Sequence, residues 1–330
     1  MKKYPTVTVL VTAKNAENTI KDCVESLLKL DYPNYNIYIT DGYSDDKTYE
    51  ILKKLKKKSP RKIKFGRVKG NIAKAHNFMI KKVKSKLIAM TDADCVVDKN
   101  WLKNLTFPFE SEDIIATVGY CSTPKSVNQL QRLIGMELED RFIKFPKFIT
   151  RGPTMNLCVK TNIAKKVKFD ERFDVAQETD WGYRLSKHGK IRYSPKAIIY
   201  HYHRPTWLSF FKQQFKYGKH MLLLYLKHKR MSTGDHISKP SMILGEIVFL
   251  ISSLFLIVSI FNGIFVFHTM LMFTLLSVLY FTDILSMTRD IDEILKFFVL
   301  YLIRNIAWSL GLFVGIFYLL KTIQTISQRL

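Results

Sequence analysis

The sequence has four cysteines, and their spacing indicates neither a disulfide motif nor a metal-binding pair. Cys23, Cys95, Cys121 and Cys158 form no CxxC pair, and no histidine lies beside one at metal-ligand spacing. This excludes a disulfide-rich scaffold and predicts reduced thiols in the core or in loops of a cytosolic domain. The first apolar run ends at Thr12, so it is too short for a signal peptide. The sequence also has no internal repeat and no low-complexity linker.

Acidic residues are scarce as well. The 330 residues include 52 Lys and Arg against 28 Asp and Glu, a formal net charge of +24, yet 47% of the residues are hydrophobic. That hydrophobic share excludes a disordered basic tail, and the length suffices for about two domains. A nucleic-acid-binding protein is one interpretation of the charge. We expect no nucleic acid partner, because the lysines are dispersed and the sequence shows neither a basic motif interleaved with aromatic residues nor a zinc site.

Charged residues are sparse in the last part of the chain. Residues 242–330 carry five basic and five acidic side chains, so residues 1–241 hold the whole positive excess. This last part contains three apolar stretches long enough to cross a bilayer, which predicts about three transmembrane helices. The stretches are 242–261, 264–281 and 297–320.

Two charged residues lie within these stretches, and basic residues flank them. We expect Glu246 and Arg304 to snorkel toward one side of the membrane. Basic residues lie before the first stretch, and Arg289 and Lys296 lie between the second and the third. By the positive-inside rule the N-terminal domain is inside and the C-terminus outside. A net charge of +24 also fits an anionic membrane, where each nearby Lys or Arg contributes about 1 kcal/mol of attraction.

The segment before the first stretch has a helical pattern with two faces. Between 207 and 229 apolar residues gather near one face and lysines point elsewhere, which predicts an interfacial helix. The apolar residues are Leu208, Phe211, Phe215, Leu222 and Leu226. We therefore expect three parts: an α/β domain at 1–205, an amphipathic helix with a basic linker at 206–241, and a membrane domain at 242–330.

The first 120 residues alternate short β-rich runs with helical patterns, which predicts βαβ units and a mostly parallel, Rossmann-like α/β sheet. The expected strands are 6–12, 36–40, 63–67 and 87–91, and the expected helices include one beginning at Ile20 and one at 72–82. Acidic residues collect where these strands end. Ligands bind at the carboxyl ends of the strands in open α/β sheets, so we expect the site there.

Asp92 and Asp94 directly follow the fourth expected strand, with one residue between them. Two carboxylates on one side of a turn suit a hard divalent cation that bridges a diphosphate. The alternative interpretation of a lone Asp-x-Asp is a solvated loop or a helix cap. The context of this motif decides between the two.

Four segments give that context: VTVLVTAKN, DGYSDDKT, GNIAKAHN and TDADCVVDKNWL. Their order and spacing resemble the nucleotide-sugar-binding half of family 2 glycosyltransferases, which have the GT-A fold, over roughly residues 5–220. The resemblance implies that Asp41 holds the nucleobase, that Asp92 and Asp94 hold the diphosphate and its metal, and that the loop from Ala13 to Asn15 borders the nucleotide. It also implies that Lys74 and Asn77 bind the donor. The alternative interpretation of Lys74 is an exposed lysine on a helix.

The second half resembles the acceptor half of the same family. The family usually has Glu-Asp where this chain has Gln177 and Glu178, so the resemblance implies that Glu178 is the catalytic base, with Asp180 as its rival. A helix N-cap or first-turn acid is the other reading of Glu178. Trp181 and Gln213 are candidate acceptor contacts: Trp181 is more typical of a core residue, and Gln213 lies in a loosened Gln-x-x-Arg-Trp motif.

His201 and His203 follow the strand AIIY and are candidates for a third metal ligand or a diphosphate contact. Two residues apart on a strand, they are expected to point the same way. A packed or solvent-facing histidine is the other reading of each.

These features favour a metal-dependent, inverting glycosyltransferase that uses Mg2+ or Mn2+ and a nucleotide sugar, with a UDP-sugar as the first choice. The expected acceptor is a hydroxyl of a membrane-associated, polyprenyl-linked glycan, and the expected location is the cytosolic face of the plasma membrane. One alternative is a polyprenyl-phosphate sugar synthase. Another, from a different class, is a catalytically inactive nucleotide-binding membrane scaffold.

Overall fold

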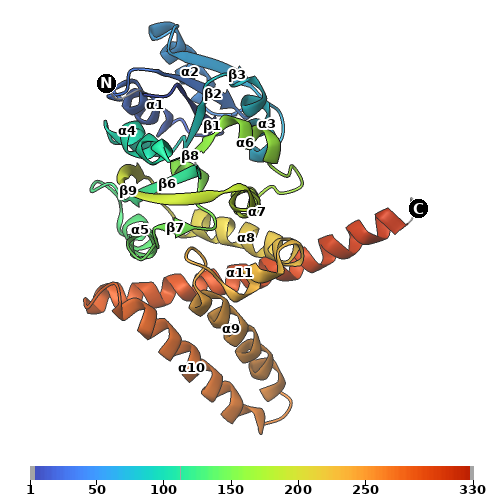
Figure 1. Cartoon of the computed structure of the whole chain (residues 1–330). Coiled ribbons are helices and arrows are strands. Elements are labelled where there is room, and N and C mark those ends of the chain that lie inside the picture. The colour runs from blue at the N-terminus through green and yellow to red at the C-terminus, as the bar shows by residue number, and fades with distance from the viewer. Residues whose placement is uncertain (1–3, 112, 328–330) are drawn as a thin grey trace. The chain divides into compact units, whose positions relative to one another are not determined.

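The computed structural model describes residues 4–111 and 113–327 (Figure 1). The chain divides into two compact units, Met1–His203 and Arg204–Leu330. The segment 206–241, predicted as an amphipathic helix with a basic linker, lies within the second unit.

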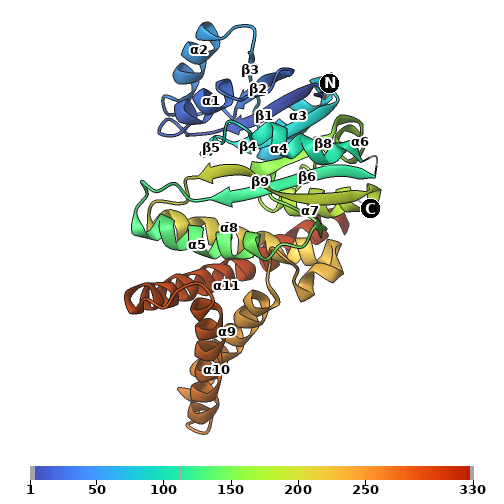
Figure 2. The same ribbon diagram turned by 60° about the vertical axis from the view of Figure 1, so that its left-hand side comes forward.

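The first unit is built on one mixed nine-stranded sheet in the order β3-β2-β1-β4-β8-β6-β9-β5, with β7 pairing to β9. Figure 2 shows β6, β8 and β9 side by side. The sheet confirms the predicted α/β class. Its strands are β1 (Val7–Ala13), β2 (Tyr35–Asp41), β3 (Ile63–Arg67), β4 (Leu87–Asp92), β5 (Cys95–Val97), β6 (Ile114–Ser122), β7 (Phe148–Ile149), β8 (Leu157–Lys160) and β9 (Lys190–His201).

Amphipathic helices connect these strands. The stripe that begins at Ile20 is buried as predicted, and β3 and α3 have the predicted bounds. The helices are α1 (Ile20–Leu28), α2 (Thr48–Lys58), α3 (Ile72–Lys82), α4 (Trp101–Thr106), α5 (Gln129–Ile143), α6 (Thr161–Val167) and α7 (Gln177–Leu185), with the short 3-10 turns η1 (Phe107–Glu110), η2 (Thr154–Asn156) and η3 (Ser186–His188).

The parallel strands β3, β2, β1 and β4 bring the carboxyl ends of distant segments to one edge. Ala13 pairs with Asp41 across β1 and β2, and Thr12 pairs with Asp92 across β1 and β4. The two acids therefore flank the end of β1, at the edge where open α/β sheets bind ligands.

β9 is one strand where the sequence predicted two. The register with β6 jumps between Gly119 and Tyr120, whose partners are Ser194 and Ile198, so a bulge accommodates Pro195. Proline has no N–H for the ladder and is tolerated at such a bulge. A side chain at Gly119 would collide with the backbone of Ala197, so this close approach requires glycine.

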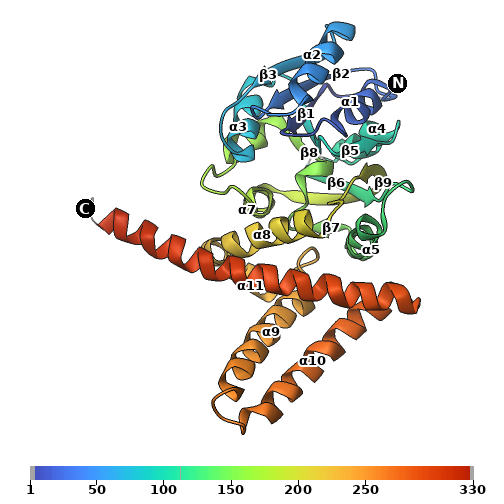
Figure 3. The ribbon, with the colours of Figure 1, turned by 180° about the vertical axis from the view of Figure 1, so that it is seen from behind.

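The second unit is helical. It contains α8 (Trp207–Lys227), η4 (Lys229–Thr233), α9 (Pro240–Ser259), α10 (Phe265–Leu285) and α11 (Ile291–Ser327). In the described part of the chain, α9, α10 and α11 are each long and apolar enough to cross a membrane. α9 and α10 form a hairpin, while α11 lies along α8 and runs across the hairpin rather than beside it (Figure 3).

Glycines and one hydrogen bond fix α8 against α11. A Cβ on Gly218 would lie 2.3 Å from the backbone oxygen of Trp308, and one on Gly311 would lie 2.2 Å from that of Phe215. The indole N–H of Trp308 donates to Gln214 Oε1 at 2.9 Å. Small residues allow this close approach of two helix backbones. The pairing gives α8 a buried face that differs from the predicted apolar one, of which Leu208 and Leu226 stay exposed.

The prediction that Glu246 and Arg304 snorkel is wrong. Both are 5% exposed and lie where the hairpin meets α11. Ser309 donates its hydroxyl to Glu246 Oε1 at 2.8 Å, and the Arg304 guanidinium lies 4.3 Å from the Tyr301 ring centroid. Burying a charged group inside a helical bundle costs less free energy when neighbouring groups in the bundle pair with it.

Candidate active site

The loops after β1 and β2 are tied together at the carboxyl edge of the sheet. The Asn15 N–H donates to Ser44 Oγ at 2.9 Å, and Asn15 Oδ1 accepts from the Asp45 N–H at 3.0 Å. Asn15 and Tyr43 have φ angles of 50° and 58°, in the left-handed region that a non-glycine residue adopts at a cost. The predicted nucleotide loop from Ala13 to Asn15 is thus held in one shape by the loop that follows Asp41.

Asp41 itself has no exposed surface. Its Oδ2 accepts from Arg67 Nε at 2.8 Å, and its Oδ1 accepts from the Ser44 hydroxyl at 2.5 Å. Its nucleobase role stays a prediction, because Ser44 or Arg67 must first release the carboxylate. The sequence analysis missed Arg67 and Tyr43, although Arg67 ends a predicted strand at the same edge. The Arg67 guanidinium lies 4.2 Å from the centroid of the half-exposed Tyr43 ring.

The two donor candidates on α3 have different surroundings. Lys74 is exposed. Asn77 holds the chain after α6: its Nδ2 donates to the Phe169 carbonyl at 2.9 Å, and its Oδ1 accepts from the Phe169 N–H at 2.8 Å. Nδ2 also donates to Glu171 Oε1 at 2.9 Å. Asn77 therefore holds the chain at Phe169 in place, and a contact between Asn77 and the donor stays a prediction.

The turn after β4 places the Asp-x-Asp motif beside a histidine of β9. His201 Nε2 lies 3.4 Å from Asp94 Oδ1, and the two side chains are 18% and 28% exposed. Burial alone lowers the pKa of His201, but the charge of Asp94 and the hydrogen bond to it outweigh burial and raise this pKa well above its usual value. The Asp94 carboxylate and the His201 imidazole are close enough to bind one divalent cation together, and Asp92, partly exposed at the end of β4, stays a predicted ligand.

His201 and His203 point the same way, as predicted, with ring centroids 4.5 Å apart. They differ in their partners. His203 is 6% exposed, its Nε2 lies 3.5 Å from Thr123 Oγ1, and its carbonyl accepts from Gln131. His201 faces Asp94, and its Nδ1 is buried without a hydrogen bond to any of the described residues. Of the two, His201 is the better placed to reach an ion at Asp94.

Glu178 lies in the first turn of α7, in the half of the unit expected to bind acceptor. Its Oε2 accepts from the N–H of Thr154 at 3.2 Å and from the hydroxyl of Thr154 at 3.1 Å. Thr154 belongs to η2, which contacts β4, β6 and β9. Within the described residues no hydrogen bond engages Glu178 Oε1, so one oxygen is anchored and the other is available for a proton. Sequence reasoning missed Thr154, because its distance from Glu178 along the chain gives no signal.

The rival residue Asp180 lies in a different environment. It has no exposed surface, and its Oδ2 accepts from Arg184 Nη2 at 2.7 Å and Nε at 2.9 Å. Arg184 also donates to the carbonyls of Val167 and Lys168, so the pair ties α7 to the end of α6. Full burial and the pair with Arg184 favour a structural role for Asp180, and its catalytic role stays a prediction.

Trp181 is a core residue and cannot serve as a sugar platform. It has no exposed surface, and its ring stacks on Phe169 with centroids 4.2 Å apart. The acceptor contact predicted for Trp181 is thus wrong, because burial removes both ring faces from solvent. Gln213 is half-exposed on α8 in the second unit, and its acceptor contact stays a prediction.

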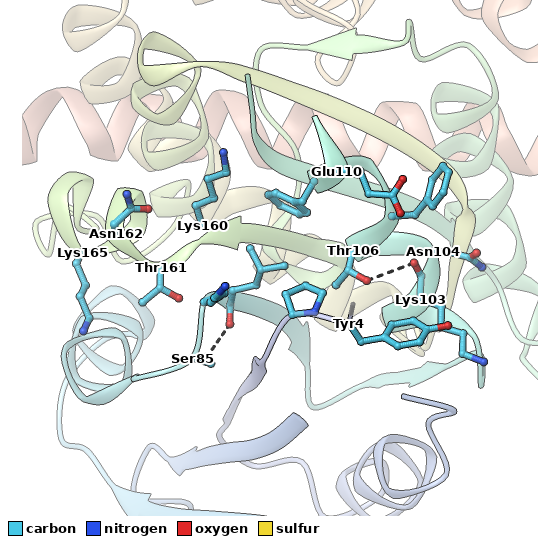
Figure 4. Close-up of a pocket in the computed structure, with 15 residues that line it drawn as sticks. Tyr4, Ser85, Lys103, Asn104, Thr106, Glu110, Lys160, Thr161, Asn162 and Lys165 are labelled. Atoms are coloured by element: carbon cyan, nitrogen blue, oxygen red, sulfur yellow. Dashed lines mark hydrogen bonds between the residues drawn. The ribbon is translucent and has the colours of Figure 1, made fainter. Parts of the chain in front are cut away.

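A cavity of about 900 Å³ lies at the other edge of the sheet, near the amino ends of β1 and β4 (Figure 4). Its walls include Tyr4, Ser85 and Lys103 and none of the predicted site residues. The strand-end rule predicts the ligand site at the opposite edge, where Asp94 and His201 lie.

The family profile described as "Glycosyl transferase family 2" matches residues 8–173, half of the chain. The chain belongs to this family. The matched segment contains the Asp-x-Asp turn and Thr154, which holds Glu178. The domain is therefore a glycosyltransferase domain, as the residues at its strand ends predicted.

Several curated proteins resemble this family member. A "Dolichyl N-acetyl-alpha-D-glucosaminyl phosphate 3-beta-D-2,3-diacetamido-2,3-dideoxy-beta-D-glucuronosyltransferase" from Methanococcus voltae is 26% identical over 64% of this chain and 71% of that protein. A "UDP-Glc:alpha-D-GlcNAc-diphosphoundecaprenol beta-1,3-glucosyltransferase WfaP" from Escherichia coli is 38% identical over 27% of this chain and 35% of that protein. A "Beta-monoglucosyldiacylglycerol synthase" from Synechocystis sp. is 30% identical over 45% of this chain, which spans 33% of that protein's length.

One solved structure matches nearly the whole chain. It is the mannosyltransferase PcManGT from Pyrobaculum calidifontis in complex with GDP-Man and Mn2+, with a TM-score of 0.60 and 12% identity over 94% of this chain and 88% of that one. At this identity the match shows a shared fold. The predicted GT-A architecture with C-terminal apolar helices is thereby confirmed.

Proposed function

We propose that this protein is a metal-dependent, inverting glycosyltransferase that moves a sugar from a nucleotide sugar to a hydroxyl of a membrane-associated, polyprenyl-linked glycan. The single observation that carries the proposal is the half-anchored carboxylate of Glu178. Thr154 fixes Oε2 through two hydrogen bonds, while Oε1 has none among the described residues. A base needs a fixed position and one accepting oxygen, and Glu178 has both.

A divalent cation would be held by Asp92, Asp94 and His201. Mg2+ or Mn2+ at this position neutralises charge on the departing nucleoside diphosphate when bound. The complex of PcManGT with Mn2+ supports a divalent cation for this fold. His203, packed near Thr123, is the second choice as a ligand.

Glu178 supplies the proton acceptor for the transfer. The acceptor hydroxyl gives its proton to Glu178 Oε1 while its oxygen attacks the anomeric carbon from the face opposite the diphosphate. The bond between that carbon and the diphosphate oxygen breaks, and the nucleoside diphosphate leaves with the electron pair. One displacement of this kind inverts the anomeric configuration. Thr154 keeps Glu178 in line with the attack through the hydrogen bonds to Oε2.

The donor site would lie over the loops after β1 and β2. Ala13 and Asn15 border the nucleotide, the aromatic ring of Tyr43 offers a face to the base, and Lys74 gives a nearby positive charge. Asp41 contacts the base after Ser44 moves, or else holds Arg67 and Tyr43 in place. The name of the Escherichia coli relative, which includes UDP-Glc, supports a UDP-sugar as the first donor to test.

The acceptor is proposed from the relatives and from the apolar helices. The names of the Methanococcus voltae and Escherichia coli relatives include a dolichyl phosphate and a diphosphoundecaprenol. A lipid-linked glycan presents a neutral hydroxyl, which needs a base such as Glu178. A polyprenyl phosphate is already an anion near neutral pH and needs none, so an anchored Glu178 favours the hydroxyl acceptor.

The membrane is the proposed location, with the catalytic unit on the cytosolic face of the plasma membrane. Four buried free cysteines in the first unit suit a reducing compartment. The α9–α10 hairpin would enter the bilayer, and the basic residues before it would contact anionic lipid.

The test uses the detergent-solubilised full chain with a panel of nucleotide sugars and lipid extracts, and mass spectrometry detects a sugar-bearing lipid. We expect transfer that stops in excess chelator, returns with Mn2+ or Mg2+, and collapses in Asp94→Ala while the protein stays folded. Asp31→Asn is the control, because Asp31 is exposed and pairs with Lys103 away from the site. Full activity in excess chelator would contradict the metal-dependent mechanism.

A further inference from the structure

A thiol lies among the residues proposed to hold the catalytic ion. Asp94, Cys95 and His201 offer one ligand atom each, and these atoms all lie within 4.8 Å of one another. Cys95 Sγ lies 3.9 Å from Asp94 Oδ1, and His201 Nε2 lies 3.4 Å from the same oxygen. The sequence predicted no zinc site, because Cys95 and His201 are far apart along the chain.

Strand register explains how these side chains meet. Cys95 pairs with His201 across the antiparallel strands β5 and β9, and directly paired residues project to the same face of a sheet. Cys121 pairs with Ile199 across β6 and β9, so it projects to that face too. His201 thus has a cysteine on each neighbouring strand.

We propose that Asp94, Cys95 and His201 form an inhibitory site for a thiophilic divalent cation, of which zinc is the type. Bond lengths of about 2.0–2.3 Å in a tetrahedral zinc site place neighbouring ligand atoms about 3.3–3.6 Å apart. The two distances to Asp94 Oδ1, 3.4 Å from His201 and 3.9 Å from Cys95, lie within a few tenths of an ångström of these values, and the sulfur and the imidazole nitrogen lie within 4.8 Å of each other. Cys95 loses its thiol proton to solvent when the ion binds.

The same ligand set discriminates between ions. Thiolate and imidazole favour zinc, whereas Mg2+ and Mn2+ prefer carboxylate and carbonyl oxygens. A zinc ion bound here takes Asp94 and His201 away from the catalytic ion, so transfer stops. Only this inhibitory consequence rests on the proposed function; the binding of the ion does not.

Binding is tested without any activity, with Co2+ as the probe on the metal-free full chain in detergent. We expect a thiolate-to-cobalt charge-transfer band in the near ultraviolet that Zn2+ abolishes. Cys95→Ser should lose the band, while Cys158→Ser should keep it, because Cys158 is an equally buried thiol of the same sheet outside the cluster. Melting temperatures verify that each variant folds, and His201→Gln is a second ligand variant in case Cys95→Ser does not.

Inhibition is tested separately in the Mn2+-supported transfer assay. We expect Cys95→Ser to tolerate at least about tenfold more Zn2+ than the wild type, with Cys158→Ser unchanged. A folded wild-type protein without the cobalt band, or a band that persists in both ligand variants, would overturn the site. Cobalt binding through Cys95 combined with equal zinc sensitivity of all the chains would overturn the inhibitory role. Absence of transfer in every chain, with the band intact, would count against the proposed function alone.

Discussion

The carboxylate of Glu178 is anchored on one side by Thr154, whose N–H and hydroxyl both donate to Oε2 at 3.2 and 3.1 Å. Asp180, two residues further along the same helix, is enclosed against Arg184 instead. Their spacing alone does not separate these two acids, because both lie in the first turn of α7. Their partners differ: Glu178 has one oxygen without a hydrogen bond among the described residues, whereas Asp180 is paired with Arg184, so we propose Glu178 as the base.

The Asp180–Arg184 pair predicts a loss of stability rather than of catalysis. Asp180→Asn removes the charge from a fully buried site and leaves Arg184 without its counter-ion. We expect the free energy of unfolding to fall by about 3 kcal/mol, with turnover per folded molecule nearly unchanged. This exceeds the cost of about 1 kcal/mol or less that a first-turn acid alone would predict. Denaturant unfolding of the variant and active-site-normalised turnover give the two numbers.

If Thr154 positions the proposed base Glu178, its removal should affect the chemical step more than donor binding. Thr154→Val keeps the shape of the buried side chain but deletes the hydroxyl that donates to Glu178. We expect kcat to fall about tenfold with the donor KM unchanged, and Thr154→Ser to recover most of the loss. A purely structural role would instead lower the melting temperature, and Ser would not restore kcat.

The fold could be read from the sequence where the pattern is local. The apolar stripes and the strand-end acids predicted the first half of the sheet, and the bounds of β3 and α3 agree with the structure. The single long β9 could not be predicted, since Pro195 interrupts the pattern and only the bulge opposite β6 reconciles it. The same holds for the candidate site. The Asp-x-Asp turn is a local motif, so the sequence predicted it.

Contacts that depend on strand register escaped sequence reasoning. Cys95 and His201 meet only because β5 pairs with β9, and Thr154 meets Glu178 only because η2 packs on three strands. No spacing in the sequence encodes either contact. The same holds for Trp181, whose stacking on Phe169 decides that it is a core residue.

His76 predicts a pH dependence of stability. It is fully buried on α3, and burial lowers its pKa from 6.5 to about 4. Below pH 6.5 His76 of the unfolded chain binds a proton, whereas His76 of the folded chain stays neutral until the pH falls to about 4. The free energy of unfolding should therefore fall by about 3 kcal/mol as the pH drops from 6.5 to 4.

The variant His76→Phe isolates this contribution, because it keeps an aromatic ring against Phe169. We expect the difference in free energy of unfolding between the variant and the wild type to grow by about 3 kcal/mol over that pH range. Urea unfolding followed by tryptophan fluorescence at several pH values measures it. A difference that stays constant with pH would show that His76 is not the group responsible.

The arrangement of the second unit predicts the topology of the C-terminus. Three crossings would place it outside, as the charge pattern alone predicts. However, α11 lies along α8 and crosses the α9–α10 hairpin, and α8 exposes Lys212 and Lys216. We expect the hairpin to insert and α11 to lie in the interface beside α8, which leaves both termini on one side.

Reporter fusions to the full chain distinguish the two topologies. A fluorescent protein that matures only in the cytosol should be active at either terminus, while a phosphatase that folds only outside should be inactive at both. A cysteine placed in the Asn262–Gly263 turn, read with membrane-impermeant thiol reagents, locates the tip of the hairpin. A phosphatase active at the C-terminus would establish three crossings instead.

The measurement that tests the account most directly compares Glu178→Gln with Asp180→Asn and the wild type in the transfer assay with the lipid-linked acceptor. Glu178→Gln keeps size and hydrogen bonding but cannot accept the proton. The account predicts a loss of about 100-fold or more in turnover with donor affinity nearly unchanged, while Asp180→Asn retains its turnover per folded molecule. The opposite ranking would move the base to Asp180, and indifference to both substitutions would contradict a hydroxyl acceptor in favour of an ionised phosphate.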